Sequence, residues 1–498
     1  MKNRSIAVSF VALAAAMVSA QSAKAAVDEL GQASSQATTE TDKQRIDRLE
    51  ATVKRLEQRL AEKDARDAAA AQQAAADRQQ AAADRAAAQQ AAQRAAADAA
   101  AVASRPKSQS DHSLELYGFA QVDAIQDFNR VDPSWDATLR PSKIPTTEGQ
   151  FGGDGQTIFS VRQSRLGVKA AGELAGKPYE AKFEFDLFGV GVDAGQTTFR
   201  LRHAYASWGP ILAGQTNSLF MDGDLFPNTI DYWGPTGMVF LRNPQVRFTF
   251  VKKNGWQAAA ALELPSNDID PGSIRLIDPE LATNLRGTEK LPDFTAMVRY
   301  DGDWGHVQLS GIMREISYDT VGTPDNEPNG SQFGWGLNLG SSFKWSMATF
   351  RLGVVYGEGI ASYMNDGGMD LAPSVALVPT PPIIPPPPSP PLNQLIDAKA
   401  VPLLGVTAYV DLQWTKELSS SLGYSFTQVD NTNFQDPTAY HKGEYASGNL
   451  LWAPAPPILT GLELLWGQRT DNDGDKGDDI RLQFSFKVSF SSKNIWGN

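Results

Sequence analysis

The sequence predicts an all-β transmembrane barrel of about 16 antiparallel strands with one constriction loop folded inward, preceded by a helical coiled-coil segment. Between Ser113 and Phe490, apolar and polar residues alternate in segments of about 10 residues, the length of a tilted strand that crosses a bilayer. The breaks between these segments are alternately short and long, which is typical of a barrel with turns at one end and loops at the other. A soluble β-sandwich also alternates, but it has no reason to sort its connections by length.

The composition excludes several other classes of protein. The chain has 498 residues, no cysteine, a net charge of −12 and a mean hydropathy of −0.32. After the N-terminal region no window of about 20 apolar residues is found, which excludes a helical membrane protein. A barrel passes this test because only alternate residues face lipid. The lack of cysteine excludes disulfides and thiol catalysis, and the acidic balance argues against a nucleic-acid partner.

The N-terminus is predicted to be a secretory signal peptide covering residues 1–25. Lys2 and Arg4 precede an apolar run over residues 6–17, and small-residue cleavage sites follow at 18–20 or 23–25. A retained anchor helix is rejected because the run is too short to span a bilayer. We therefore expect the mature protein to leave the cytoplasm, with residues 26–39 forming a linker.

Residues 40–104 are predicted to form a periplasmic stalk. Apolar residues with the 3-4-3-4 spacing of a coiled coil begin this segment, namely Ile46, Leu49, Val53, Leu56 and Leu60. Two alanine-rich near-repeats at 74–80 and 81–87 then favour helix but offer little area to bury. The sequence leaves open whether this unit oligomerises or is a single solvated helix.

The strands of the barrel, expected over residues 113–490, follow in order. The first is expected near residues 114–128 and starts on the periplasmic side if the stalk is periplasmic. Short turns are predicted at 172–178, 208–210, 253–255, 301–304, 344–345 and 415–418. The opposite connections are expected to be long, at about 129–156, 217–243, 265–291, 318–331, 358–402, 430–441 and 469–479, with one short exception at 189–196. Long polar loops suit the external side.

Two segments fit this plan poorly. In a regular strand Phe159 and Val161 would share one face with Arg165, because all three occupy alternate positions. This predicts either a bulge that switches faces or a contact with a partner subunit. The region from Ala372 to Gln394 carries ten prolines, so we expect polyproline II rather than strand. This region is interpreted as a stiff spacer in a long loop, with a ligand role as the alternative.

Charged residues share one face of the predicted strands. Because a charge on the lipid face costs about 2–4 kcal/mol at the midplane, this face is expected to line a water-filled lumen. The predicted basic pore wall consists of Arg165, Lys169, Arg200, Arg202, Arg242, Arg247, Arg299, Arg351 and Arg481, and Lys487 has the same parity. Lumen-facing acids are fewer: Glu184, Asp186, Glu263, Asp411 and Glu463, while many other acids are expected in loops such as 471–479. Rings of Arg and Lys select anions. The alternative is that each Arg pairs with a neighbouring acid and only braces the wall.

The segment 217–240 is the predicted constriction loop. It combines acids with aromatic residues, namely Asp222, Asp224 and Asp231 with Phe220, Phe226, Tyr232 and Trp233. Folding inward would bury the rings and place the acids opposite the arginines, and the resulting transverse field would orient a charged solute. The alternative is an outward loop at a subunit contact.

No enzymatic, metal or cofactor site is expected. The four histidines, His112, His203, His306 and His441, lack the spacing of a metal site or a Ser/His pair. The acidic run at 471–479 lacks the Gly and Glu that a calcium-binding EF-hand loop requires at its sixth and twelfth positions. The competing interpretation to a channel is therefore a structural tether with a largely closed barrel.

Several short motifs resemble the early strands of Gram-negative trimeric porins. They are Arg165–Lys169, Glu173-Leu174, Ala181–Asp186, Arg202–Tyr205 and Ala213–Thr216. Within the porins, Leu116–Phe119 behind a predicted coiled coil resembles the start of the DcaP-like outer-membrane porin family. Such barrels usually end on an aromatic residue; Phe490 matches, but residues 491–498 extend beyond it.

The resemblance implies a sixteen-stranded homotrimer whose third external loop enters the pore. It also implies passive uptake of small organic anions, with dicarboxylates and aromatic acids as the substrate class. The expected partners are small anionic solutes, outer-membrane lipid and lipopolysaccharide.

Overall fold

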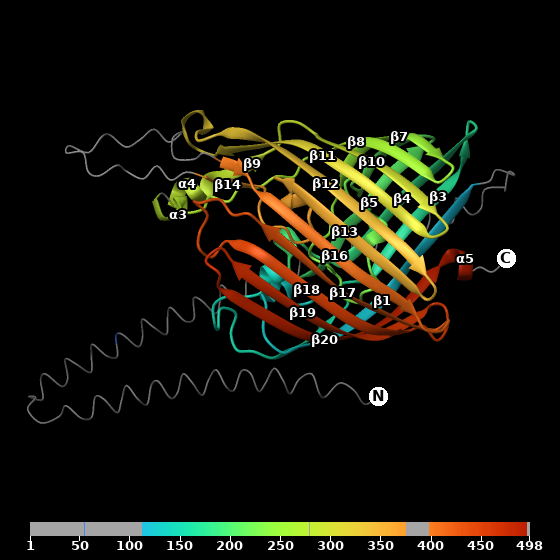
Figure 1. Ribbon diagram of the computed structural model, residues 1–498. Coiled ribbons are helices and arrows are strands. Elements are labelled where there is room, and N and C mark those ends of the chain that lie inside the picture. The colour runs from blue at the N-terminus through green and yellow to red at the C-terminus, as the bar shows by residue number, and fades with distance from the viewer. Residues whose placement is uncertain (1–53, 55–111, 278, 375–397, 496–498) are drawn as a thin grey trace, which may run out of the picture. The chain divides into compact units, whose positions relative to one another are not determined.

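The computed structural model describes residues 112–277, 279–374 and 398–495, together with Lys54. They form an 18-stranded antiparallel sheet closed into a barrel, and a separate two-stranded sheet (Figure 1). The predicted signal peptide, linker and coiled-coil stalk lie outside the described residues.

The strands of the closed sheet occupy nearly all of the chain from Ser113 to Ser491. The first half comprises β1 (Ser113–Asp127), β2 (Gln156–Ser160), β3 (Arg165–Leu174), β4 (Lys177–Phe188), β5 (Thr197–Trp208), β6 (Ile211–Asn217), β7 (Arg242–Lys253), β8 (Trp256–Glu263) and β9 (Leu285–Thr288). The second half comprises β10 (Asp293–Gly302), β11 (Gly305–Thr320), β12 (Gly330–Trp345), β13 (Ala348–Glu358), β16 (Pro402–Gln413), β17 (Leu418–Val429), β18 (Tyr440–Trp452), β19 (Ile458–Asp471) and β20 (Lys476–Ser491).

These eighteen segments make sixteen barrel strands, because two of the strands are interrupted. β3 and β2 pair with the first and second parts of β1, and β10 and β9 pair with the first and second parts of β11. β1 also pairs with β20, from Tyr117 opposite Ser491 to Asp127 opposite Arg481, which closes the barrel. The predicted sixteen-stranded antiparallel barrel is confirmed.

The break between β2 and β3 explains the parity problem at residues 157–164. Ser164 N donates to Val161 O at 3.0 Å, so the chain turns sharply there and leaves the ladder. Before the break Phe159 points outward and is 76% exposed; within it Arg162 and Gln163 are buried. The irregularity therefore switches faces before Arg165, as the first of the two interpretations expected.

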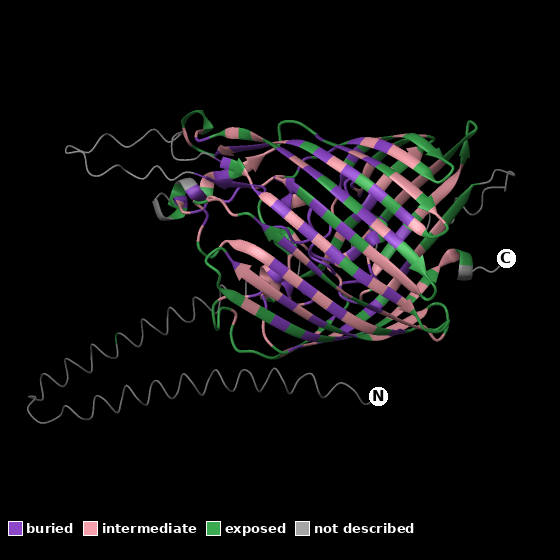
Figure 2. Ribbon diagram, in the orientation of Figure 1, coloured by how far each residue is buried: buried purple, intermediate pink, exposed green. Residues whose placement is uncertain are grey.

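The alternation of burial along the strands confirms the predicted faces. In β20 the side chains of Arg481 and Gln483 are buried, whereas Leu482 and Phe484 are exposed. Figure 2 shows the same alternation of buried and exposed residues along most strands. The exposed apolar residues form the outer wall that a membrane protein presents to lipid.

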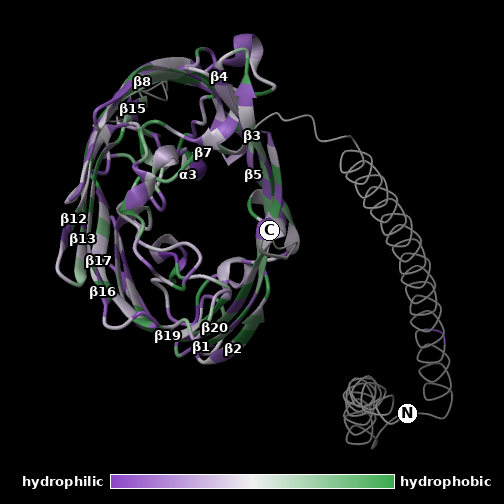
Figure 3. Cartoon of the chain, turned by 90° about the vertical axis from the view of Figure 1, so that its right-hand side faces the viewer, coloured by the Kyte–Doolittle hydropathy of each residue, from purple (hydrophilic) through white to green (hydrophobic). Residues whose placement is uncertain are grey.

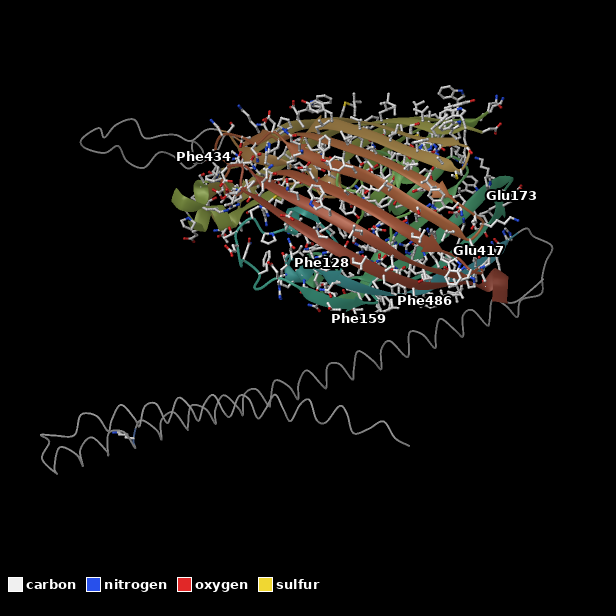
Figure 4. The ribbon with its side chains drawn as sticks, turned by 60° about the horizontal axis from the view of Figure 1, so that its bottom comes forward. Phe128, Phe159, Glu173, Glu417, Phe434 and Phe486 are labelled. Carbon is white, nitrogen blue, oxygen red and sulfur yellow. The ribbon has the colours of Figure 1, made fainter. Side chains whose placement is uncertain are left out.

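Short turns and long loops lie at opposite ends of the barrel. Glu173 and Glu417, next to two of the turns, are at one end, and Phe434, in a loop, is at the other (Figure 4). We call these the turn end and the loop end. The six predicted turns are all present, and a seventh at residues 453–457 was not predicted.

One predicted long loop is wrong. At 469–479 the connection is only residues 472–475, because β19 continues to Asp471 and β20 begins at Lys476. Asp471 and Asp479 therefore lie in strands, with their side chains inward and buried. Arg469 and Arg481 bind them at 2.6 and 2.7 Å, so charged residues continue the ladder here.

The proline-rich region begins differently from the prediction. Ala372 and Pro373 belong to β14 (Leu371–Pro373), which pairs with β15 (Ala398–Ala400) in the separate two-stranded sheet. Proline is tolerated at the end of such an edge strand because its missing N–H is not needed there. The rest of the predicted polyproline segment, 375–397, lies outside the described residues.

Among the described residues, helices are few and short. They are α3 (Ile274–Ile277), α4 (Pro279–Asn284), α5 (Ser492–Ile495) and the single 3-10 turns η1 (Pro133–Trp135), η2 (Pro141–Lys143), η3 (Gly191–Asp193), η4 (Gly223–Leu225), η5 (Pro324–Asn326) and η6 (Ala361–Tyr363). Within the described part of the chain, no helix has the length and apolarity needed to cross a membrane. α5 is fastened to β1 at the turn end: Leu116 N donates to Ser492 Oγ at 3.1 Å, and Lys493 Nζ lies 3.1 Å from Glu115.

Candidate functional site

The loop between β6 and β7, residues 218–241 (loop L3), folds into the barrel. Its residues Leu219, Phe220 and Met221 are buried, and the side chains of Ser310 and Asn338, inward-facing on β11 and β12, donate to Phe220 O at 2.8 Å each. Figure 3, which looks along the barrel, shows loop segments crossing the space inside the ring of strands. The structure thus has the inward arrangement and not the outward alternative.

Three of the predicted lumen-facing acids hold the main chain of L3. Glu263 accepts a hydrogen bond from Leu219 N at 2.9 Å, and Asp411 accepts one from Asn228 N at 3.2 Å. Glu463 accepts one from Ile230 N. Because these carboxylates are bound to the loop, they leave little negative charge on the open lumen.

Two of the predicted L3 acids meet one arginine of the predicted basic wall. Asp222 and Asp224 bind Arg299 at 3.4 and 2.6 Å, and Asp222 also contacts His306 Nε2 at 2.7 Å. Asp231 is buried, which raises its pKa, and it accepts hydrogen bonds from Thr138 Oγ1, Leu139 N and Gly234 N. Asp222 and Asp224 therefore fasten L3 to Arg299, and Asp231 fastens it to the first loop.

Two other acids lie within the arginine cluster itself. Arg202 reaches Glu184 at 2.8 Å and Asp186 at 2.9 Å, and Arg200 binds Asp186 at 2.7 Å. A register shift between β4 and β5 places the neighbours Arg202 and His203 both on the buried side. The Tyr232 hydroxyl of L3 joins this network through Asp186 and the two arginines.

Arg242, by contrast, has no acidic partner. Among the described residues its side chain makes no ion pair and no hydrogen bond, and its Nε is buried without a partner. Its guanidinium lies 4.5 Å from the centre of the Phe240 ring, a cation–π contact. Lys487 is similar: its Nζ lies 5.3 Å from the Phe119 ring, and no carboxylate of the described residues pairs with it.

Arg242 and Phe240 lie where two interior cavities meet. A cavity of about 970 Å³ opens toward the loop end and is lined by Arg140, Lys143 and Arg200 among others. A second cavity, of about 610 Å³, opens toward the turn end and is lined by Arg165, Arg202 and Lys487. Only Phe240 and Arg242 line both of them. We call this pair the junction of the two cavities.

The remaining predicted wall residues lie elsewhere. Arg247 and Arg299 line a smaller cavity of about 330 Å³ beside L3. Arg351 is paired with Asp411 at 2.6 Å, and Lys169 with Glu180 at 2.8 Å. Arg481 is fully buried: it binds Asp127 and Asp479 and donates to the carbonyls of Asp136 and Thr138 in the first loop.

The aromatic residues predicted for L3 are divided between two sites. Phe226 contacts Phe240 at a ring distance of 5.0 Å, near the junction. Tyr232 stacks on Phe188 at 4.2 Å, and Trp233 meets Trp135 edge-on at 4.9 Å. The sequence did not single out Phe240, Arg140 or Lys143 for the site. Arg140 and Lys143 lie in a long loop, where alternation along a strand provides no signal.

Comparisons with known proteins agree with this architecture. A family model described as DcaP outer membrane protein matches residues 71–362. The outer membrane channel DcaP of Acinetobacter baumannii has the same fold, with a TM-score of 0.62 and 22% identity over 77% of this chain and 99% of that one. The anion-selective porin from Comamonas acidovorans (TM-score 0.48, 10% identity, 76% of this chain and 100% of that one) and OmpT of Vibrio cholerae (0.45, 10%, 76% and 98%) are more distant. No curated protein sequence matches significantly.

Proposed function

Because the chain belongs to the family of DcaP outer membrane proteins, we propose that it is a passive channel of the outer membrane for small organic anions such as dicarboxylates. Membership of the family and the porin-like barrel give the location and the class of protein. The preference for anions and the class of solute rest on the charges inside the barrel.

The observation that carries the proposal is the unpaired Arg242 at the junction. Around it are Arg165, Arg200, Arg202 and Lys487, of which Arg200 and Arg202 pair with the carboxylates of Asp186 and Glu184. An anion that passes from one cavity to the other meets Arg242 after leaving the basic residues of the first cavity and before reaching those of the second. A succession of cations favours anions along the whole path.

Dicarboxylates suit this arrangement because cations stand on both sides of the junction. Guanidinium groups bind carboxylates through two parallel hydrogen bonds, which gives both affinity and orientation. A solute with two carboxylates can keep one bound while the other moves across Phe240. A single carboxylate loses this advantage.

The proposed orientation places the turn end in the periplasm, as in other barrels with short periplasmic turns. A stalk before Ser113 then projects into the periplasm, since β1 starts at that end. Tryptophans mark the membrane interface at the turn end: Trp208, Trp256, Trp304, Trp345, Trp414 and Trp452 are 39–69% exposed. The outer wall above them would contact lipid and, at the loop end, lipopolysaccharide.

A homotrimer would use the sector of the wall that lacks this belt. Strands β20, β1, β3 and β4 carry no tryptophan, and β3 to β6 surround an outward hollow of about 370 Å³. Its lining includes five small residues, Ala170, Ala181, Ala204, Ala206 and Ala213, beside larger ones such as Val168 and Phe183. Small side chains allow a neighbouring barrel to approach closely. The double substitution A181F/A206F should therefore convert trimers to monomers in light-scattering measurements, whereas L337F on β12 should not. Unchanged trimers would place the interface elsewhere.

Uptake and selectivity test the function itself. Liposome-swelling rates should be faster for dicarboxylates than for amino acids or sugars of similar size. Reversal potentials in planar bilayers under a salt gradient should show anion preference. A preference for cations would contradict the proposed selectivity, and a protein that never conducts would contradict the channel.

A further inference from the structure

A second loop lies alongside L3 inside the barrel. This loop, L6, joins β13 to β16, and its described first part is residues 359–374. Phe240 N donates to Tyr363 O and Asn365 N donates to Met238 O, both at 2.9 Å, and Val239 and Met364 form an antiparallel bridge between these bonds. Residues 238–240 of L3 and 363–365 of L6 therefore form a short ladder that ends next to Arg242.

Side chains extend the contact between L6 and L3. Trp233 Nε1 donates to Asn365 O at 2.7 Å, and Asn365 Nδ2 donates to the carbonyls of Trp233 and Pro235 at 2.8 and 2.9 Å. Ile360 and Tyr363 are fully buried in one hydrophobic cluster with Phe220 of L3. The last part of L3 is thus bound to L6 both by its main chain and by packing.

The two parts of L3 differ in what holds them. Leu219, Asn228 and Ile230 are bound by wall carboxylates, and Gly237 N donates to Ser425 Oγ on β17 at 2.8 Å. For Met238–Phe240 the main-chain hydrogen bonds found among the described residues go to L6. This stretch includes Phe240 of the junction, so L6 determines where that ring lies.

The barrel wall holds the first residues of L6: Arg314 Nη1 donates to Gly359 O at 3.0 Å, and the Tyr363 hydroxyl donates to Asp293 at 2.8 Å. The residues of L6 that follow are fastened to the first loop by one carboxylate. Asp366, 2% exposed, accepts hydrogen bonds from Arg140 Nη2 at 2.8 Å and Nε at 3.2 Å, and from Ser142 N at 2.8 Å and Oγ at 2.6 Å. The Arg140 guanidinium makes cation–π contacts with two rings that pack edge-on against each other, Trp135 at 4.2 Å and Trp233 at 4.6 Å. Asp366 therefore joins L6 to the first loop, residues 128–155, with the Trp233 side chain of L3 packed against the same arginine.

We propose that L6 is a second constriction element and that Asp366 is the positioning residue that keeps the junction open. With Asp366 bound, the ladder holds Phe240 beside Arg242 at the edge of the path. When that binding is lost, residues 364–368 of L6 move with residues 238–240, and Phe240 enters the space between the two cavities. The inference rests on the proposed channel function.

Single-channel recording of the full-length protein tests this inference. In D366N the neutral amide cannot accept the four hydrogen bonds, so open times should be about tenfold shorter than in the wild type. The sign of the ion selectivity should stay the same, because Arg242 is retained. R140K is a milder second variant. Lysine keeps the positive charge but lacks the paired N–H groups with which the guanidinium binds Asp366, so its open times should be intermediate. D436N is the matched control: Asp436 also pairs with an arginine at the loop end, Arg275, but contacts neither L3 nor L6.

A cysteine pair tests whether the two parts of the ladder move as a unit. Val239 and Met364 are bridge partners in an antiparallel ladder, whose Cα separation suits a disulfide, and the chain has no other cysteine. Adding V239C/M364C to D366N should leave the open times as short in the oxidised protein as in the reduced one, because the disulfide joins two segments that move together.

The outcomes distinguish the two proposals. A conducting wild type with unchanged open times in both D366N and R140K would overturn this inference and leave the channel function intact. An oxidised V239C/M364C/D366N protein with wild-type open times would also overturn it, because the two segments would then separate when they move. A wild type that never conducts would overturn the proposed function and this inference together.

Discussion

Replacing Arg242 should change the ion selectivity more than replacing any other single residue of the barrel wall. The substitution R242Q removes the charge at the junction while keeping a side chain of similar length. R242K retains the charge. Because Arg242 has no ion pair or hydrogen bond to lose among the described residues, neither substitution leaves a carboxylate without its partner.

The size of the effect follows from the position of the charge. Two unit charges 4 Å apart interact by about 1 kcal/mol in water and about 4 kcal/mol at an effective dielectric constant near 20. Arg242 is partly buried but faces two wet cavities, and Arg165, Arg200 and Arg202 remain nearby. We therefore expect a loss near the lower end, about 1–2 kcal/mol for a passing anion, which is a five- to thirtyfold change in relative permeability.

Reversal potentials across planar bilayers under a potassium chloride gradient measure this ratio directly. R242Q should lose most of the anion preference, and R242K should keep it. R286Q is the control, because Arg286 is exposed near the loop end and paired with Asp319 at 2.9 Å. If R242Q retained the full anion preference, the unpaired arginine would not determine selectivity and the argument from the junction would be refuted.

Two further substitutions test assignments that differ from the sequence-based predictions. R481M should lower the free energy of unfolding of the barrel by about 3–5 kcal/mol, because Asp127 and Asp479 lose their buried partner. Circular dichroism should then show unfolding at a lower temperature. The ion selectivity should match the wild type, and a loss of anion preference would return Arg481 to the pore wall. Burial and the nearby charge of Asp370 raise the pKa of Asp268, which lines the loop-end cavity, to about 7. As the pH falls from about 8 to about 6 this carboxylate becomes neutral, so anion preference should rise in the wild type and stay constant in D268N; equal pH dependence in both would assign the effect to another group.

Much of the barrel could be predicted from the sequence, because the alternation of polar and apolar residues within a strand distinguishes its two faces. Every second residue points the same way, so the alternation around Phe183, Glu184 and Phe185 shows the lumen side without knowledge of any partner strand. The lengths of the connections then separate the two ends. The one wrong loop, at 469–479, shows the limit of this reasoning. Asp471 and Asp479 resemble loop residues in the sequence, but each lies in a strand and pairs with an arginine two residues away on the same face, Arg469 or Arg481.

The candidate site could be predicted only in outline. The alternation of residues along the strands placed Arg165, Arg200, Arg202 and Arg481 on the same, lumen-facing side. In the structure, however, Arg481 is buried beneath the first loop, whereas the other three line the cavities. Whether a lumen charge is free depends on what folds against it. That is decided by loops far away in sequence, as when Glu263 and Glu463 bind the main chain of L3.

By itself, the sequence determined that this chain forms a membrane barrel, how many strands it has and which face of each is polar. These properties can be predicted because polar and apolar residues alternate with a period of two within each strand. Only the tertiary structure decided that Arg242 has no acidic partner among the described residues and that L6 and L3 together hold Phe240 beside it. Ion pairing and loop packing join residues more than a hundred positions apart, as Val239 and Met364 are. No local pattern in the chain records such contacts.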